Sequence, residues 1–480
     1  MIFYELNNML NCNAAFFKSF IVDTRIYYVL AAGLLSLSAC VSPPQSKTLI
    51  DDETVLPTHF TLSGSTTIDS SWWLAFGDST LESLIEQALV NNFDLRSSFA
   101  SVKKAKAVRM QAAADQGIWV SGEVNGQRDD GNKQYSGSLS ASYEVDLWGE
   151  ISAAIESAEY DFRSTEEDYR AAALSLSAEV ASTWYELVAA EKNLSIRKQQ
   201  LSINESILTL TQEQFRYGMS TIADSIQQAA LVASSKAEIA DQRATIDVLK
   251  HSLNVLLGRS AERDIPIENI ALPILPTLPA TGIPSKVLAQ RPDIRSQWMS
   301  LQAANADVAE AVANRFPSLS LALSTQSIVG HASDLFHSWT VTLLASLAGD
   351  IWTNGSNKAQ VTEMKAAVEI ALNDYNHMLL EAIQETEDAL SNEYFIAQRL
   401  EHLQEQRDLT YQALEQLQAS YRSGSITFNE LLTTIDSAQS LDVDVVNVQQ
   451  LVIENRISLY RALSSGWSID STDSLIAAKK

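Results

Sequence analysis

The sequence predicts an α+β membrane protein in which long helices make up most of the chain and short strands interrupt them. Three observations support this prediction. The chain of 480 residues contains an internal repeat, it has long runs free of proline and glycine, and it has segments in which apolar and polar residues alternate. The repeat indicates two copies of one structural unit, the runs indicate helices and the alternation indicates strands with one apolar face.

Matching motifs recur at an almost constant distance along the chain. Phe215–Gly218 (FRYG) has a counterpart in Tyr421–Gly424 (YRSG), 206 positions later. Asp146–Gly149 (DLWG) is matched by Asp350–Trp352 (DIW). Asp94 and Asp293 are the centres of a third matching pair. Several pairs in nearly one register indicate an architectural repeat and not a chance motif.

Four runs without proline or glycine are predicted to be helices: 150–217, 219–257, 356–423 and 425–465. They are rich in Ala, Leu, Glu and Gln, which favour helix. Each of the two longest would extend about 100 Å at about 1.5 Å per residue. A free-standing structural coiled coil is the alternative. It does not explain Gly218 and Gly424, which divide each copy into a long helix, a tight turn and a shorter helix.

Two segments, 135–147 and 339–347, alternate between apolar and polar residues, apart from Leu344. With the apolar residues that precede each, they predict hairpins at 117–147 and 317–350. Strands of about 9–11 residues are long enough to cross a bilayer at a tilt. Four strands cannot close a barrel, and an open edge is not tolerated in lipid. Strands in a membrane would therefore require several chains to share one barrel.

A small soluble sheet packed on one side is the alternative for these strands. The two interpretations differ in where the apolar side chains lie. Burial of Leu139, Tyr143, Val341 and Leu343 inside a self-contained globule would exclude the membrane interpretation.

The composition gives no indication of catalysis. The formal net charge of −25 argues against a nucleic-acid partner, which would require a basic surface. The sequence has no zinc-type spacing of Cys and His, no glycine-rich phosphate loop and no nucleophile elbow. We therefore predict no catalytic residues, no metal site and no cofactor, and passive conduction instead of a reaction.

Residues 1–39 are predicted to be a signal peptide of the lipoprotein type. The apolar run Ile26–Ala39 follows Lys18 and Arg25 and ends in small residues, as secretory signals do. The ending Leu37–Cys40 (LSAC) resembles the bacterial lipobox, which implies cleavage before Cys40 and acylation of that residue, with palmitate among the expected lipids. An ordinary signal peptide with an incidental cysteine is the alternative.

Taken together, the chain resembles the TolC family of outer-membrane efflux channels, in particular the lipid-anchored branch that serves RND-type multidrug pumps. The resemblance covers the lipobox, Trp72–Asp78 (WWLAFGD), the Asp293 segment, both hairpins and both glycine turns. It implies a homotrimer with a shared twelve-stranded β-barrel in outer-membrane lipid and a helical α-barrel that extends into the periplasm. The resemblance also implies a belt of shorter elements, formed by residues 61–75, by the linker at 266–284 and by the tail after Gly466.

On this interpretation the chain divides into the signal peptide, a first repeat at 40–265, a proline-rich linker at 266–284, a second repeat at 285–466 and a tail at 467–480. The resemblance implies an exit duct for drugs or toxic small molecules that works with a periplasmic adaptor and an inner-membrane RND-type pump. Alternatives are a similar duct for protein secretion or metal export, and a lipid-anchored structural coiled coil. The lipobox favours the pump-coupled branch, and seven methionines do not favour metal export.

The resemblance also implies a gate at the periplasmic end. Asp224 and Glu430 each lie six residues after their glycine and would form a carboxylate ring in the trimer. Tyr421 matches a family tyrosine that tethers the inner helix pair, with Asp224 as its expected partner. The sequence departs from the family pattern at Thr433, where many relatives have a second Asp, and at Asn429, in place of an apolar constriction residue, and Asp436 would restore the missing negative charge one turn further along. From the residues alone, these carboxylates are also explained as solvated helix starts, which the helix dipole favours.

The turns at the ends of the long helices are the expected contacts of the adaptor. Each glycine allows a tight reversal without strain at Cβ. The alternative is that the glycines only terminate helices. The predicted contact residues are Arg216, Tyr217, Gly218, Met219, Arg422, Ser423, Gly424 and Ser425.

Overall fold

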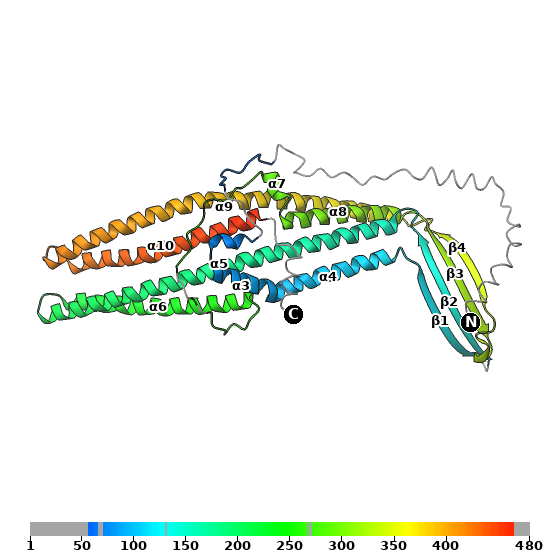
Figure 1. The fold of residues 1–480 in the computed structure, drawn as a ribbon, viewed down its shortest axis with the longest axis horizontal. Helices are drawn as coiled ribbons and strands as arrows, with labels where there is room; N and C mark the ends of the chain where they lie inside the picture. Colours follow the sequence, from blue (N-terminus) through cyan, green and yellow to red (C-terminus); the bar gives the residue numbers. More distant parts are fainter. Residues whose placement is uncertain (1–55, 66–70, 130–131, 266, 268–270, 465–480) are drawn as a thin grey trace. The chain divides into compact units, whose positions relative to one another are not determined.

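The computed structural model describes residues 56–65, 71–129, 132–265, 267 and 271–464 (Figure 1). The predicted signal peptide, Cys40 and the tail at 467–480 lie outside the described residues, as does part of the linker. Within the described part, none of the helices combines the length and the apolar character needed to span a membrane.

The internal repeat is confirmed by helices of matched length. The first long helix α5 and its counterpart α9 have 67 residues each, and the shorter α6 and α10 have 35 and 36. A 22-residue helix precedes the strands in each copy, as α4 and α8. The bounds are α3 Ser79–Asn91, α4 Phe93–Ala114, α5 Glu150–Arg216, α6 Ile222–Leu256, α7 Pro284–Leu288, α8 Pro292–Ala313, α9 Ser356–Arg422 and α10 Phe428–Leu463, with short 3-10 helices η3 Trp72–Phe76 and η4 Ala332–Asp334.

All four predicted long helices are confirmed, but the shorter α4 and α8 were not predicted as helices. Local sequence explains why they form. The side chain of Asn92 accepts a hydrogen bond from the Leu95 amide at the start of α4, and α8 begins with Pro292 at a position where no amide donor is needed. These two helices lead directly into the strands.

Both predicted hairpins are present and together form one antiparallel sheet in the order β1-β2-β3-β4. In the register, Tyr135 of β2 lies opposite Val329 of β3, so the central pairing joins the two repeats. The outer strands β1 and β4 each have one partner within the chain. The bounds are β1 Trp119–Asp129, β2 Asn132–Val145, β3 Ser318–Val329 and β4 Thr340–Ala348.

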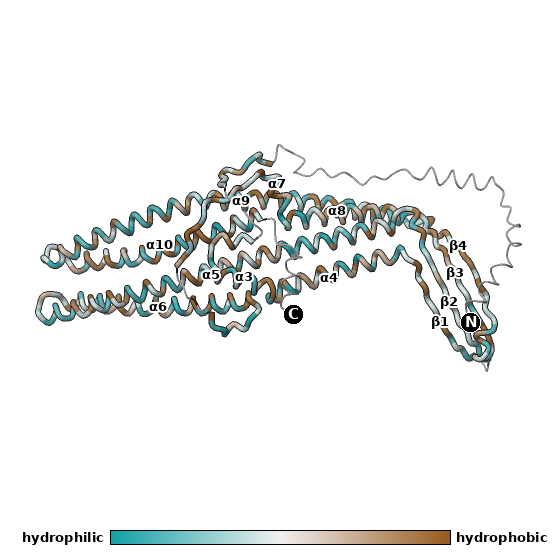
Figure 2. The backbone as a smooth tube through the Cα atoms, viewed as in Figure 1, coloured by the Kyte–Doolittle hydropathy of each residue, from teal (hydrophilic) through white to brown (hydrophobic). Residues whose placement is uncertain are grey.

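The apolar side chains of the sheet are exposed. Leu139, Tyr143, Val341 and Leu343 all lie on the surface of the chain, and Leu343 is 78% exposed. Figure 2 shows hydrophobic positions recurring along the strands as well as along the helices. These side chains are therefore not buried in a globular core. This excludes the alternative of a small soluble sheet packed on one side.

The main hydrophobic core lies where the motif Trp72–Asp78 packs among α3, α5 and α10. The Trp72 ring lies 5.9 Å from that of Tyr460 in α10, and the Phe76 ring lies 5.5 Å from that of Tyr185 in α5. The Asp78 carboxylate caps α3 and accepts a hydrogen bond from the Trp184 indole at 2.8 Å. The motif is therefore structural, because its rings join the two repeats.

We call residues 56–65 and 271–283, with the parts of α8, α9 and α10 near them, the belt region. Ion pairs and hydrogen bonds of charged side chains hold this region together. Arg291 binds Asp293 at 2.7 Å and Glu385 at 2.8 Å. Arg456 binds Glu393 and the Pro276 carbonyl. Gly64 donates its amide proton to the Pro279 carbonyl at 2.9 Å, which pairs the two belt segments.

Burial by itself raises the pKa of Asp293, but the hydrogen bond and positive charge of Arg291 outweigh burial. The pKa of Asp293 is therefore held below its ordinary value. This carboxylate stays ionised in the fold and contributes stability as a charged group.

Candidate functional site

The two helix tips have the same backbone geometry. Gly218 and Gly424 adopt positive φ angles of 71° and 75°, which glycine reaches without strain. After each glycine, a backbone amide bonds back to the helix: Met219 to the Gln214 carbonyl at 2.8 Å, and Ser425 to the Ser420 carbonyl at 2.9 Å. These are Schellman-type ends, so the glycines do terminate helices.

The tips also present exposed side chains to a partner. Tyr217 is 77% exposed and Met219 is exposed as well. A Cβ atom built on Gly218 or Gly424 would meet nothing within 4 Å in this chain. The backbone at both glycines is therefore open to close approach, as an adaptor contact would require.

Asp224 and Glu430 both belong to capping boxes. The Thr221 hydroxyl accepts from the Asp224 amide, and the Asp224 carboxylate accepts from the Thr221 amide at 2.9 Å. Thr427 and Glu430 repeat this arrangement at the start of α10. The hydrogen bonds from the Thr427 amide and hydroxyl lower the pKa of Glu430. Within one chain, both carboxylates therefore act as caps of helix starts.

Asp224 is the expected partner of Tyr421, but within one chain the Tyr421 hydroxyl donates to another residue. The Tyr421 hydroxyl donates to Gln214 Oε1 at 3.0 Å, and its ring lies 5.8 Å from that of Phe428. The Asp224 carboxylate accepts from the Thr221 amide. Partial burial, followed by the negative charge of Asp224, raises the pKa of Tyr421, so the two groups still interact through space.

The other predicted gate residues have different surroundings. Asn429 accepts a hydrogen bond from Gln227 Nε2 at 3.1 Å, which links the starts of α6 and α10. Thr433 is exposed and its hydroxyl donates to the Asn429 carbonyl on its own helix. Asp436 lines a surface groove between α9 and α10. The structure thus brings Tyr421 and Asn429 into contacts between the repeats.

Sequence reasoning missed a set of amide side chains that join α5 to α10, which we call the amide ladder. Asn193 donates to Asn447 at 2.8 Å, and Gln200 donates to the Gln439 carbonyl at 2.8 Å. Asn204 and Gln439 exchange hydrogen bonds at 3.1 and 3.3 Å. Positions 193, 200 and 204 repeat at seven and four residues, a spacing that places them on one helix face and was the available signal.

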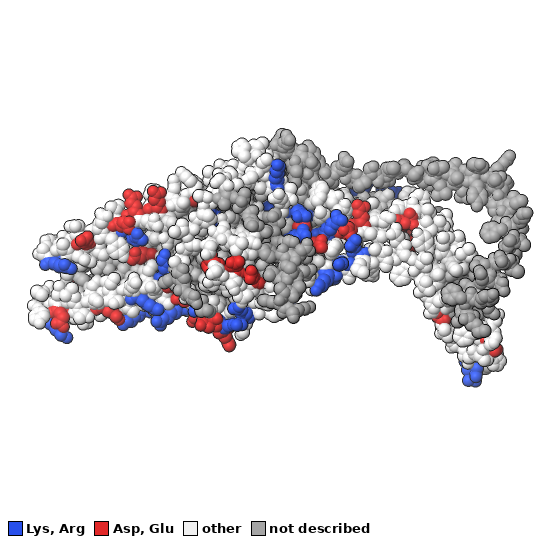
Figure 3. All heavy atoms as spheres, viewed as in Figure 1, with Lys and Arg blue, Asp and Glu red and all other residues white. Residues whose placement is uncertain are grey.

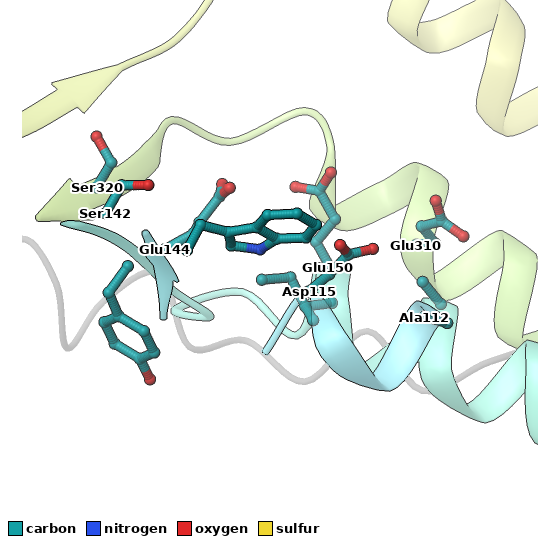
Figure 4. A pocket seen from close by; sticks show the side chains of 11 residues that line it. Ala112, Asp115, Ser142, Glu144, Glu150, Glu310 and Ser320 are labelled. Carbon is teal, nitrogen blue, oxygen red and sulfur yellow. The ribbon is translucent and has the colours of Figure 1, made fainter. Parts of the chain in front are cut away.

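A cavity of about 360 Å³ lies where the helices meet the sheet (Figure 4). Its lining includes Asp115, Glu144, Glu150 and Glu310, and we call this group the acidic junction. Burial, followed by the charges of Glu144 and Asp146, raises the pKa of Glu150. Burial, followed by the charges of Asp307 and Glu150, raises the pKa of Glu310.

The charges on the surface are mixed in sign. On the face shown in Figure 3, acidic and basic side chains are interspersed along the helices. No single-sign charged surface of the described residues therefore marks a site on this face. The candidate site consists of the glycine tips, the hydrogen bonds between the repeats near the tips, and the acidic junction. All three lie along helices that end at the sheet or at the turns.

Comparisons with known proteins agree with this arrangement. The family model described as "Outer membrane efflux protein" matches residues 84–259 and 283–465. OpmQ of Pseudomonas aeruginosa, a pyoverdine export outer membrane protein, is 28% identical over 470 residues, which cover 92% of this chain and 97% of that protein. CusC of Escherichia coli K12, a cation efflux system protein, is 25% identical over 436 residues, or 86% of this chain and 93% of that protein.

Among solved structures, the outer-membrane channel OprN superimposes with a TM-score of 0.79 at 27% identity. The match covers 89% of this chain and 100% of OprN. Family model, relatives and fold agree over most of the chain. The chain belongs to the outer membrane efflux protein family.

Proposed function

We propose that this chain is the exit duct of a tripartite efflux system and conducts drugs or other toxic small molecules passively out of the cell. The single observation that carries the proposal is the four-stranded sheet with exposed apolar side chains, joined to two matched helical hairpins. The chain is an export channel of the outer membrane and not an enzyme. Its partners are two further copies, a periplasmic adaptor and an inner-membrane RND-type pump.

Assembly follows from the sheet. A lipid-embedded sheet must satisfy the backbone groups of its outer strands, which in one chain are β1 and β4. Three copies placed edge to edge give a closed barrel of twelve strands, an even number as in other outer-membrane barrels. The helices then continue the wall of the duct into the periplasm.

We assign the lipid anchor to Cys40, with the signal peptide removed before it. This assignment rests on the sequence LSAC at 37–40. Cys40→Ser is expected to abolish incorporation of radiolabelled palmitate. Recovery of normal labelling in that variant would refute the anchor.

We place the gate at the glycine tips. Opening requires the helix pair α9–α10 to move relative to α5–α6, which breaks the Tyr421–Gln214 and Gln227–Asn429 hydrogen bonds. Neutral bonds of this kind contribute about 0.5–1.5 kcal/mol each. An adaptor that binds the open form more tightly by a few kcal/mol is therefore sufficient to shift the equilibrium. Asp224, Glu430 and Asp436 add negative charge near this end, and Thr433 adds a neutral hydroxyl.

The substrate is set elsewhere in the system. OpmQ and CusC, named for pyoverdine and for cations, resemble this chain to a similar degree over nearly its full length. A duct of one design therefore serves chemically different cargo. Cation export is the second candidate function, and the similarity to CusC favours it.

Planar-bilayer recordings of the purified protein test the channel. We expect discrete, stable conductance steps from the wild type. Asp224→Ala with Glu430→Ala is expected to increase the conductance by loosening the closed end. Asp224→Asn with Glu430→Gln keeps a cap acceptor and separates the effect of charge from that of capping.

Glu415→Ala, which removes an exposed carboxylate of α9, is the matched control and should leave the conductance unchanged. An assembled, membrane-inserted wild type that conducts no ions would overturn the proposed function. Unchanged conductance in both double variants would instead contradict the gate assignment alone.

A further inference from the structure

The connection between β2 and α5 contains a tryptophan that joins the two repeats. The Trp148 indole N–H donates to the Pro317 carbonyl at 2.8 Å. Its ring stacks on Phe316, with centroids 4.8 Å apart and planes at 26°. Phe316 and Pro317 form the turn between α8 and β3, so Trp148 of the first repeat is docked on the second.

The second repeat carries the same tryptophan without the same partner. Trp352 follows β4 as Trp148 follows β2, and each lies two residues after an aspartate. Trp352 is 85% exposed, and its neighbour Ile351 is fully exposed. Among the described residues, Trp352 has neither a hydrogen-bond acceptor nor a ring contact. Adjacent exposed apolar side chains of this size are typical of an interaction surface.

The docking turn also has a counterpart. The turn after α4 is closed by a hydrogen bond from the Gly117 amide to the Ala114 carbonyl, and the turn after α8 by one from Phe316 to Ala313. Gly117 therefore corresponds to Phe316, and Ile118, which is 69% exposed, corresponds to Pro317.

The sheet keeps Trp352 and this second turn on opposite edges of the chain. Ile118 precedes β1 and Trp352 follows β4, and these are the two outer strands. In a closed ring of chains, the β4 edge of one copy meets the β1 edge of the next. The second repeat of one copy then meets the first repeat of its neighbour in the same arrangement in which Trp148 meets the α8–β3 turn within one chain.

We propose that Trp352 docks on the α4–β1 turn of the neighbouring copy, with its indole N–H donating to the Ile118 carbonyl. This inference deepens the proposed function, since it rests on a closed trimer. Gly117 offers no ring in place of Phe316, so the indole packs directly on the backbone and on the Ile118 side chain. The exposed Ile351 adds apolar contact area to the same interface.

The connection in the second repeat is two residues longer than that in the first. Gly149 directly follows Trp148, whereas Thr353 and Asn354 separate Trp352 from Gly355. Asn354 adopts a positive φ of 52°, unlike any other non-glycine residue of the described part. The two extra residues let Trp352 extend beyond its own chain.

Photocrosslinking tests the contact. With p-benzoylphenylalanine in place of Trp352, irradiation of the assembled full-length protein should give bands of two and three chains on a denaturing gel. The crosslinked peptides should contain Gly117 or Ile118. The matched control places the same probe at Trp148, where crosslinks should form within one chain at Phe316 or Pro317 and leave its mass unchanged.

Dissociation kinetics provide an independent measurement. Trp352→Ala should speed dissociation of the detergent-solubilised trimer about tenfold, which corresponds to one lost hydrogen bond and its packing per interface. Trp352→Phe, which loses the N–H donor but keeps an aromatic ring, should have an intermediate effect. A conducting trimer in which the probe at position 352 crosslinks only within its own chain would overturn this inference and leave the proposed function intact. Absence of both trimer and conductance would overturn the proposed function itself.

Discussion

The belt region and the amide ladder hold the chain together by different means, the first with charges within the second repeat and its linker and the second with neutral side chains between the repeats. In the belt region, buried guanidinium groups bind carboxylates, as Arg456 binds Glu393 with a side chain only 4% exposed. In the amide ladder, neutral side chains such as Asn204 and Gln439 exchange hydrogen bonds. A buried charge that loses its partner is strongly destabilising, whereas an amide can exchange one neutral partner for another. The belt region is therefore suited to stay fixed while the tips rearrange.

The largest expected effect is the removal of a belt charge. Arg456→Ala leaves Glu393 without its ion-pair partner and the Pro276 carbonyl without its donor. We expect a loss of about 3–5 kcal/mol in the free energy of unfolding. Chemical denaturation followed by circular dichroism measures it.

Arg407→Ala is the control for this prediction, because Arg407 pairs with the exposed Asp408. That change should cost at most about 1 kcal/mol. Equal losses in the two variants would contradict the distinction between a fixed belt and a rearranging tip half.

The next largest effect concerns the amide ladder. Asn204→Ala removes both hydrogen bonds of the half-buried Gln439 side chain and the one that the Ser235 hydroxyl accepts, although Ser235 keeps its bond to the Leu231 carbonyl, and should cost about 1–3 kcal/mol. With Gln439→Ala, a double-mutant cycle should give a coupling of about 1 kcal/mol. Gln199→Ala, on the exposed face of the same helix, is the control and should have little effect. Strict additivity of the two ladder changes would show that the two amides do not interact.

A smaller effect on stability, but a measurable one on conduction, is expected at the tip. Tyr421→Phe removes the hydrogen bond to Gln214 and should increase conductance while lowering stability by about 1 kcal/mol or less. Tyr394→Phe is the matched control, because that hydroxyl accepts a hydrogen bond from Gln398 on its own helix. A conductance increase of the same size in both variants would exclude a specific role for Tyr421.

The smallest effects are expected from pH, and their signs differ between regions. Glu150 and Glu310 have raised pKa values, so they destabilise the acidic junction while ionised. This destabilisation is relieved as the pH falls through the raised pKa values. Asp293 has a lowered pKa, so its contribution is present above its ordinary pKa and is lost as the pH falls through the lowered value.

Unfolding measured from pH 7 to below the ordinary pKa of aspartate tests these signs. Glu150→Gln with Glu310→Gln should stabilise the protein at neutral pH and flatten the pH dependence in the range where the wild type gains stability. Asp293→Asn should lower stability at neutral pH instead. A double Gln variant that is less stable than the wild type at pH 7 would contradict the assigned sign.

The features that the sequence predicts well are local. The absence of glycine and proline predicts α5 and α9 almost to the residue, and alternation predicts both hairpins, because each pattern reflects the structure of its own segment. The contact of Tyr421 with Gln214 joins residues 207 positions apart, and no local pattern identifies that partner. The capping box of Asp224 is local, whereas the surroundings of Tyr421 depend on how the two repeats pack.

The central claim is that the sheet lies in lipid and is completed only by other copies of the chain. Spin labels on single cysteines along β2 and β4 test it most directly in proteoliposomes, through collisions with oxygen and with a water-soluble nickel complex. Labels at Leu139, Val341 and Leu343 should collide with oxygen and be shielded from nickel, whereas labels at Ser138 and Thr342 should show the opposite preference. Equal access of nickel to both sets of positions would contradict the account.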